Sequence, residues 1–145
     1  KEWFIDPLGF ENNIFWQIDG KKNNSIKAYC CFNSNARDFA RFGKLYKDFG
    51  KWNGNQILDS TFIAKSIKPR FEESSEYGYG FWLGEINKNR FFAMRGILGQ
   101  YVIVVPEKNT IIVRLGERNN EKDNNRPKDF DSYFIESLNM LEKSN

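Results

Sequence analysis

Apolar residues recur every three or four positions in the stretch that follows Ser34, and this is the clearest pattern in the chain. The repeat predicts an amphipathic helix that uses Ser34 as its N-cap and ends near Gly50. We expect Arg37 and Asp38 on the exposed side of this helix. The residues that form its apolar face are Ala36, Phe39, Ala40, Gly43 and Tyr46.

Further helix and strand signals follow this first helix. An Asn-Gly pair at residues 53–54 predicts a tight turn. Asp59 and Ser60 then offer a cap for a second, shorter helix that should stop before Pro69. Strand-like segments then cover residues 79–86, 90–95, 100–105 and 110–115, and their short polar connections favour antiparallel neighbours. A final helix is predicted from the helical spacing of Phe130, Phe134, Leu138 and Leu141.

These elements predict an α+β fold, in which helices pack on one face of an antiparallel β-meander of three to four strands. We expect residues 1–145 to form a single domain. In the first part of the chain, Phe15, Trp16 and Ile18 are expected to be partly buried. The predicted parts are loop and short strands at 1–33, two helices at 34–70, the meander at 77–116 and the last helix at 129–142.

Composition excludes several classes of function. The 22 basic and 19 acidic residues are well mixed, so no basic stripe indicates a nucleic-acid partner. No apolar run approaches the roughly 20 residues that span a bilayer. The chain contains 0 His, which excludes imidazole catalysis and histidine-based metal sites, and we expect no cofactor and no metal site.

The two cysteines, Cys30 and Cys31, are adjacent. Neighbouring cysteines do not readily form an unstrained disulfide, so we expect them to be unpaired with each other. At least one of them is predicted to be a small buried core residue.

Four blocks of sequence stand out in order along the chain: residues 35–46, 50–58, 77–82 and 95–108. Together they resemble the second half of the class C β-lactamase-related serine hydrolases, and the resemblance extends over about Pro7 to Gly116. It implies a partial β-lactamase/transpeptidase-like fold and an exported bacterial hydrolase of the β-lactamase and penicillin-binding-protein superfamily. Such enzymes act on a small-molecule or peptide substrate, an amide, ester or β-lactam, through an acyl-enzyme.

Two catalytic elements of that family are missing from the sequence. No serine is followed at the third position by a lysine, so the Ser-x-x-Lys nucleophile and base are absent. No tyrosine is followed at the second position by asparagine, so the family's Tyr-x-Asn element is absent as well. Both normally precede the region resembled. We therefore expect this chain to be inactive alone, as the C-terminal portion of a hydrolase.

The third element, Lys-Thr-Gly or His-x-Gly, has its best match at Met94, Arg95 and Gly96. The resemblance makes this triplet the substrate-binding edge strand and the main-chain N–H of Ile97 half of an oxyanion hole. Arg95 could supply the positive charge that Met94 does not. The structural alternative is an ordinary hairpin with a bulge at the glycines.

Two further features fit more than one interpretation at the level of sequence. The aromatic and glycine residues at 77–82 suit either a stacking platform or a strand that passes closely under a helix. The whole chain could also be a non-catalytic binding or interaction module. In either case, the surface left by a missing N-terminal portion would favour self-association.

Overall fold

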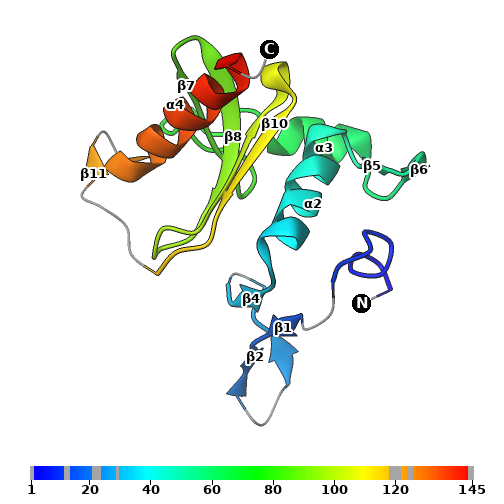
Figure 1. Cartoon of the computed structure of the whole chain (residues 1–145). Helices are drawn as coiled ribbons and strands as arrows, with labels where there is room; N and C mark the ends of the chain where they lie inside the picture. The colour runs from blue at the N-terminus through cyan, green and yellow to red at the C-terminus, as the bar shows by residue number, and fades with distance from the viewer. Residues whose placement is uncertain are drawn as a thin grey trace.

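The computed structural model describes residues 2–11, 14–20, 24–28, 30–117, 122–123 and 126–143. Its centre is an antiparallel sheet of four strands in the order β10-β9-β8-β7 (Figure 1). The register pairs Trp82 with Ala93, Arg95 with Tyr101 and Thr110 with Val105. The strands are β7 (Trp82–Ile86), β8 (Asn89–Arg95), β9 (Tyr101–Val105) and β10 (Thr110–Arg114). The predicted α+β fold with an antiparallel meander is confirmed.

Helices cover both faces of this sheet (Figure 1). Helix α2 (Ala36–Lys47) and helix α3 (Ser60–Ser66) lie on one face, and helix α4 (Lys128–Lys143) lies on the other. The prediction of helices on one face is therefore wrong. Both faces are covered because of β9. All five of its residues are buried, and they alternate between the two faces, so each face of the sheet carries apolar side chains that need a cover.

Alternation along the strands divides the core into two clusters. Phe92, Val102 and Val104 point towards α2 and α3, where they pack with Tyr46 and Ile63. The intervening positions point towards α4. The buried residues of that second cluster are Ile86, Phe91, Ala93, Tyr101, Ile103, Val105, Phe130, Phe134 and Leu138.

Helix α2 is held close to the sheet by a glycine. A Cβ atom at Gly43 would lie 3.0 Å from Cγ1 of Val102 and 3.2 Å from Cγ2 of Ile111. The N-cap is Asn35, one residue later than predicted, and its side chain accepts a 3.0 Å hydrogen bond from the Asp38 N–H. Absence of a side chain at position 43 is what allows the helix and β9 to meet.

Asp38 is fully buried, which corrects its expected place on an exposed helix face. Its carboxylate accepts hydrogen bonds from the Glu11 N–H (2.9 Å), from Arg41 Nη1 (2.6 Å) and from the Ser34 hydroxyl. Burial by itself raises the pKa of Asp38, but these three hydrogen bonds outweigh burial and lower it. Asp38 thus ties the N-terminal segment to the start of α2.

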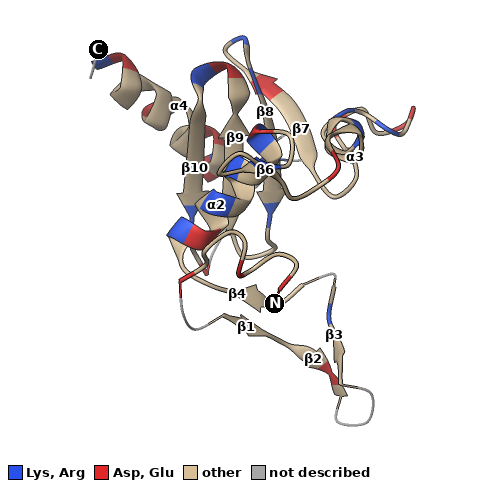
Figure 2. Ribbon diagram, turned by 90° about the vertical axis from the view of Figure 1, so that its right-hand side faces the viewer, with Lys and Arg blue, Asp and Glu red and all other residues tan. Residues whose placement is uncertain are grey.

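Short two-residue strands build an arm that extends away from the sheet (Figure 2). Phe15 is 64% exposed, and Trp16 and Ile18 are exposed too, so their predicted partial burial is wrong. The strands of the arm pair only with one another among the described residues, and Phe32, rather than these three residues, makes the ring contacts with Phe10 and with Phe39 of α2. Its paired strands are β1 (Phe15–Trp16) with β4 (Phe32–Asn33) and β2 (Ile18–Asp19) with β3 (Ser25–Ile26).

Cys30 and Cys31 form a disulfide with each other, so the prediction that they are unpaired is wrong. Cys31 adopts a φ of 69°, and this left-handed turn brings the two neighbouring sulfurs together. Cys30 and Cys31 are both half-buried, so neither is the buried core residue that was predicted.

The remaining elements connect these parts. The predicted Asn-Gly turn is confirmed, since Asn53 and Gly54 take φ values of 47° and 83° between two short strands. These connecting elements are β5 (Lys51–Trp52), β6 (Asn55–Gln56), the 3₁₀ helix η1 (Pro106–Lys108), β11 (Lys122–Asp123) and β12 (Arg126–Pro127).

No helix in the described ranges combines the length and the apolar character that a membrane span needs.

Candidate functional site

The predicted site residues lie at the end of β8 and in the turn that joins β8 to β9, residues 96–100. The backbone of this turn is closed by the Gly96 N–H, which donates to the Gln100 carbonyl (2.8 Å), and by the Gly99 N–H, which donates to the Gly96 carbonyl (3.2 Å). Gly99 has a φ of +84°, a conformation that favours glycine. The turn therefore has a defined shape set by its own main chain.

The side chains of Gln100, in the turn, and of Arg114, on β10, support this turn. The Leu98 N–H donates to Oε1 of Gln100 (3.3 Å), and Nε2 of Gln100 donates to the carbonyl of Gly116 after β10. Nη1 of Arg114 donates to the Gly99 carbonyl. A Cβ atom at Gly96 would lie 2.3 Å from Oε1 of Gln100, so a larger residue there would displace the Gln100 side chain.

Met94 and Arg95 point to opposite faces of the sheet. Met94 packs against the cluster under α2 and α3, whereas the Arg95 guanidinium lies over the Trp82 ring, 4.1 Å from its centroid, on the α4 side. Burial lowers the pKa of Arg95, although arginine stays charged at any ordinary pH. The two side chains cannot both contact one ligand at the sheet surface, because neighbouring residues of a strand face opposite ways.

Ile97 and Leu98 form the tip of the turn. The Ile97 side chain is 87% exposed and that of Leu98 is 49% exposed. The structure thus places Met94, Arg95, Gly96 and Ile97 at the end of β8 and the start of the turn. Their roles in substrate binding and in an oxyanion hole stay predictions.

Behind the turn lies a polar network that the sequence did not reveal. The Tyr101 hydroxyl donates to Oδ1 of Asp129 (3.0 Å), and Arg114 forms an ion pair with the other carboxylate oxygen at 3.6 Å. Burial and the hydrogen bond to Asp129 raise the pKa of Tyr101 to about 12. Tyr101 therefore stays protonated at neutral pH and acts as a hydrogen-bond donor to Asp129. No local pattern signals this pair, because its members lie on separate elements.

The segment 77–82 passes closely under a helix, as the second interpretation expected, but it is not a strand there, because β7 begins only at Trp82 and not at Tyr79 as predicted. A Cβ atom at Gly78 would lie 2.0 Å from the Ser66 carbonyl oxygen, so the chain passes closely under the end of α3. The Tyr79 N–H donates to the same carbonyl (2.9 Å). Gly78 is needed for this close approach. Tyr77 packs against Trp82, with 5.0 Å between ring centroids, whereas Tyr79 is exposed.

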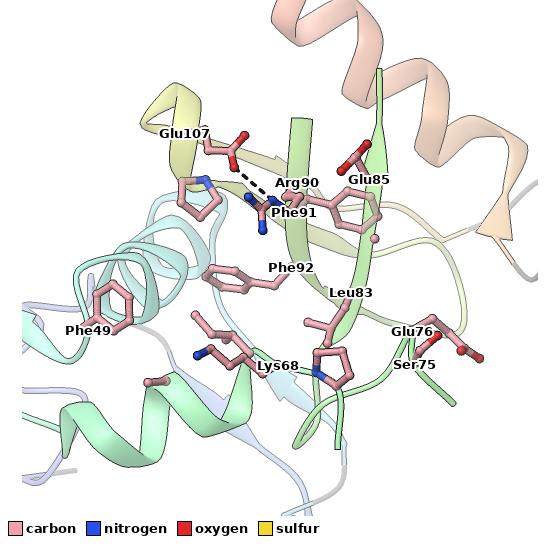
Figure 3. A pocket seen from close by; sticks show the side chains of 15 residues that line it. Phe49, Lys68, Ser75, Glu76, Leu83, Glu85, Arg90, Phe91, Phe92 and Glu107 are labelled. Atoms are coloured by element: carbon pink, nitrogen blue, oxygen red, sulfur yellow. Dashed lines mark ion pairs between the residues drawn. The ribbon is translucent and has the colours of Figure 1, made fainter. Parts of the chain in front are cut away.

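A shallow groove of about 820 Å³ lies at the opposite end of β8 from the turn (Figure 3). Phe92 and Leu83 line its centre, and Arg90 forms a 3.3 Å ion pair with Glu107 at its rim. The groove is amphipathic, and its described lining contains no serine and lysine in catalytic spacing. Elsewhere in the described ranges, no three His, Cys, Asp or Glu side chains gather closely enough to hold a metal ion.

Comparisons with known proteins agree with this architecture. Neither a protein-family model nor a curated protein matches the sequence. A solved structure, "Putative 6-aminohexanoate-dimer hydrolase from Bacillus anthracis", is similar with a TM-score of 0.71 and 25% identity, over 94% of this chain and 36% of that one. Another, "Crystal structure of putative beta-lactamase from Bacteroides dorei DSM 17855", shares the fold with a TM-score of 0.61 and 16% identity, over 93% of this chain and 49% of that one.

The chain spans between about a third and a half of the length of these two neighbours, 36% and 49%. It shares with them the fold that its four sequence blocks predicted. The resemblance drawn from the sequence is confirmed: the chain is β-lactamase-like and fits the C-terminal part of such a protein.

Proposed function

We propose that the complete protein carrying this chain is a serine hydrolase, which forms an acyl-enzyme with an amide, an ester or a β-lactam. One observation supports this above others. The β-lactamase-like fold extends over 94% of the chain, and its β8–β9 turn is closely bonded where the resemblance expects the third catalytic element. Because one fold hosts several chemistries, this defines the class of reaction and leaves the substrate open.

In this proposal the chain contributes one wall of the active site. The main-chain N–H of Ile97 is one oxyanion donor, and the N–H of the nucleophilic serine, from another part of the protein, is the other. A main-chain donor does not depend on the side chain, so Ile is acceptable there. The bonds around Gly96 and Gly99 fix the turn in advance, and a fixed donor needs no reorganisation when negative charge develops on the substrate.

Labelling with a fluorophosphonate probe, which reacts with activated serines, tests the proposal. We expect the complete open reading frame to be labelled at the serine of an upstream Ser-x-x-Lys motif, and its Ser→Ala variant to be unlabelled. The 145-residue chain alone should not be labelled. An open reading frame without the motif, or labelling of this chain by itself, would contradict the proposal.

The second candidate function is a binding or interaction module that keeps the scaffold without the catalysis. The missing Ser-x-x-Lys and Tyr-x-Asn elements favour it. Here the chain by itself would be a stable monomer. Light scattering across a range of protein concentrations separates this from a part that needs the rest of a hydrolase, for which association is expected.

Self-association through uncovered surface is part of the first proposal. Within the described residues, β10 pairs only with β9, so its other edge could accept another strand. Several large apolar side chains, such as Phe15 on the arm and Leu115 beyond β10, are also exposed. We further propose that the protein is exported, since the Cys30–Cys31 disulfide fits an oxidising compartment.

A further inference from the structure

The tip of the β8–β9 turn presents aliphatic side chains to solvent. Ile97 is 87% exposed and Leu98 is 49% exposed. Leu115, also exposed, follows β10, and Gln100 binds the carbonyl of the next residue, Gly116. Single exposed apolar residues are common, but these lie on one turn and on the strand end bonded to it.

This apolar tip has a fixed position. Gly96 and Gly99 close the turn through main-chain hydrogen bonds of 2.8 and 3.2 Å, and Leu98 bonds through its N–H to Gln100. A turn held in this way loses little conformational freedom when a ligand binds it. The exposed side chains are therefore a preformed contact surface.

The guanidinium groups of the two arginines next to the turn, Arg95 and Arg114, are directed away from its tip. Arg95 stacks over Trp82 on the α4 side of the sheet, and Arg114 is engaged by the Gly99 carbonyl and by Asp129. A carboxylate placed against Ile97 would gain neither guanidinium as a partner, whereas an aliphatic group there would cover apolar surface. Contact with these side chains therefore favours an uncharged, apolar ligand.

We propose that the substrate of the hydrolase presents an uncharged, apolar group to Ile97 and Leu98, and that these two side chains determine this preference. The inference rests on the proposed function. If the N–H of Ile97 binds the reacting carbonyl oxygen, its side chain, one Cα away, lies within contact distance of the substrate. The preferred substrate class is an ester or amide with an aliphatic group, in place of one with a carboxylate.

Two p-nitrophenyl esters of matched chain length, the butyrate and the hemisuccinate, test this in the complete open reading frame. We expect kcat/KM to be at least about tenfold higher for the butyrate, the size expected when a small apolar group fits a site better than a polar one. Ile97→Asn should lower kcat/KM for the butyrate by about tenfold while the main-chain donor is kept. Ile97→Lys should reverse the preference.

Ile26→Asn is the matched control, because Ile26 is an exposed isoleucine on the arm, 56% accessible to solvent and far along the chain from the turn. It should leave both rates unchanged. Leu98→Asn gives a second test if an Ile97 variant loses its folded circular dichroism spectrum.

The possible results distinguish failure of this inference from failure of the proposed serine hydrolase function. A protein that is labelled by the fluorophosphonate but hydrolyses the hemisuccinate as fast as the butyrate overturns the inference alone. Equal rates for wild type and Ile97→Asn do the same. A protein that is neither labelled nor active overturns the proposed function and the inference with it.

Discussion

The Tyr101 hydroxyl donates a 3.0 Å hydrogen bond to Oδ1 of Asp129 and so joins β9 to the first turn of α4. Both residues are buried, and Arg114 pairs with the other oxygen of the same carboxylate at 3.6 Å. The bond holds α4 against the sheet directly behind the β8–β9 turn. Its removal should therefore affect the stability of the fold.

We expect Tyr101→Phe to lower the free energy of unfolding by about 1–2 kcal/mol, since a buried hydrogen bond is lost and Asp129 loses a donor. Urea denaturation at neutral pH measures the change. Tyr79→Phe is the control, because Tyr79 is 44% exposed and a surface substitution should stay within about 0.5 kcal/mol. Equal effects for the two variants would contradict a special role for Tyr101.

The same tyrosine should make stability depend on alkaline pH. Its pKa rises from 10.0 to about 12 on folding, so the folded state favours the protonated phenol. The stabilisation is complete below pH 10 and is lost as pH rises towards 12. Urea titrations across this range should show a decline that Tyr101→Phe reduces. A decline of equal size in the variant would refute the assignment.

Asp38 should make stability depend on acid pH. Its folded pKa lies below the ordinary value of 3.8, because hydrogen bonds from Ser34, Glu11 and Arg41 outweigh burial. The contribution is present above that value and is lost as pH falls through the folded pKa. Asp38→Asn should lower the free energy of unfolding at neutral pH by about 2–3 kcal/mol, because charged hydrogen bonds are weakened.

The measurement for Asp38 is urea denaturation at neutral and at acid pH. The Asp38→Asn variant should lose less stability than wild type on acidification. Asp19→Asn, at an exposed position on the arm, is the control and should behave like wild type. A wild-type acid response in Asp38→Asn would place the titrating group elsewhere.

Gly43 should tolerate no large side chain. Gly43→Leu forces atoms into the space next to Val102 and Ile111, where even a Cβ would lie 3.0 and 3.2 Å away. Overpacking of this kind costs about 1–3 kcal/mol, which thermal denaturation would detect. Arg37→Leu, on the same helix with an 82% exposed side chain, should leave the melting temperature nearly unchanged. A stable Gly43→Leu protein would mean that α2 can move away from β9.

The cysteines offer a simple chemical test. Since Cys30 and Cys31 are bonded to each other, the purified oxidised protein should show no reactive thiol from this pair and two after reduction in denaturant. Trp16 donates through Nε1 to the Cys30 carbonyl (3.0 Å), so reduction should also change tryptophan fluorescence. Two thiols in the unreduced protein would contradict the disulfide.

Local sequence determined the elements of this protein. The spacing of apolar residues predicted helices α2 and α4, the short polar connections predicted the antiparallel meander, and Asn53 with Gly54 predicted a turn. Each of these follows from contacts between residues close in the chain, which is why a periodic pattern reports them. The four sequence blocks likewise led to the β-lactamase-like fold.

For the candidate site, sequence located the stretch from Met94 to Ile97 on and after a predicted strand, and the alternation of a strand already puts Met94 and Arg95 on opposite sides of the sheet. Only the folded structure decided that the Arg95 charge rests on Trp82. Tertiary packing also decided that helices cover both faces, because β9 is apolar on each side. Contacts between distant positions, such as Tyr101 with Asp129, leave no local period in the sequence, so only the folded chain reveals them.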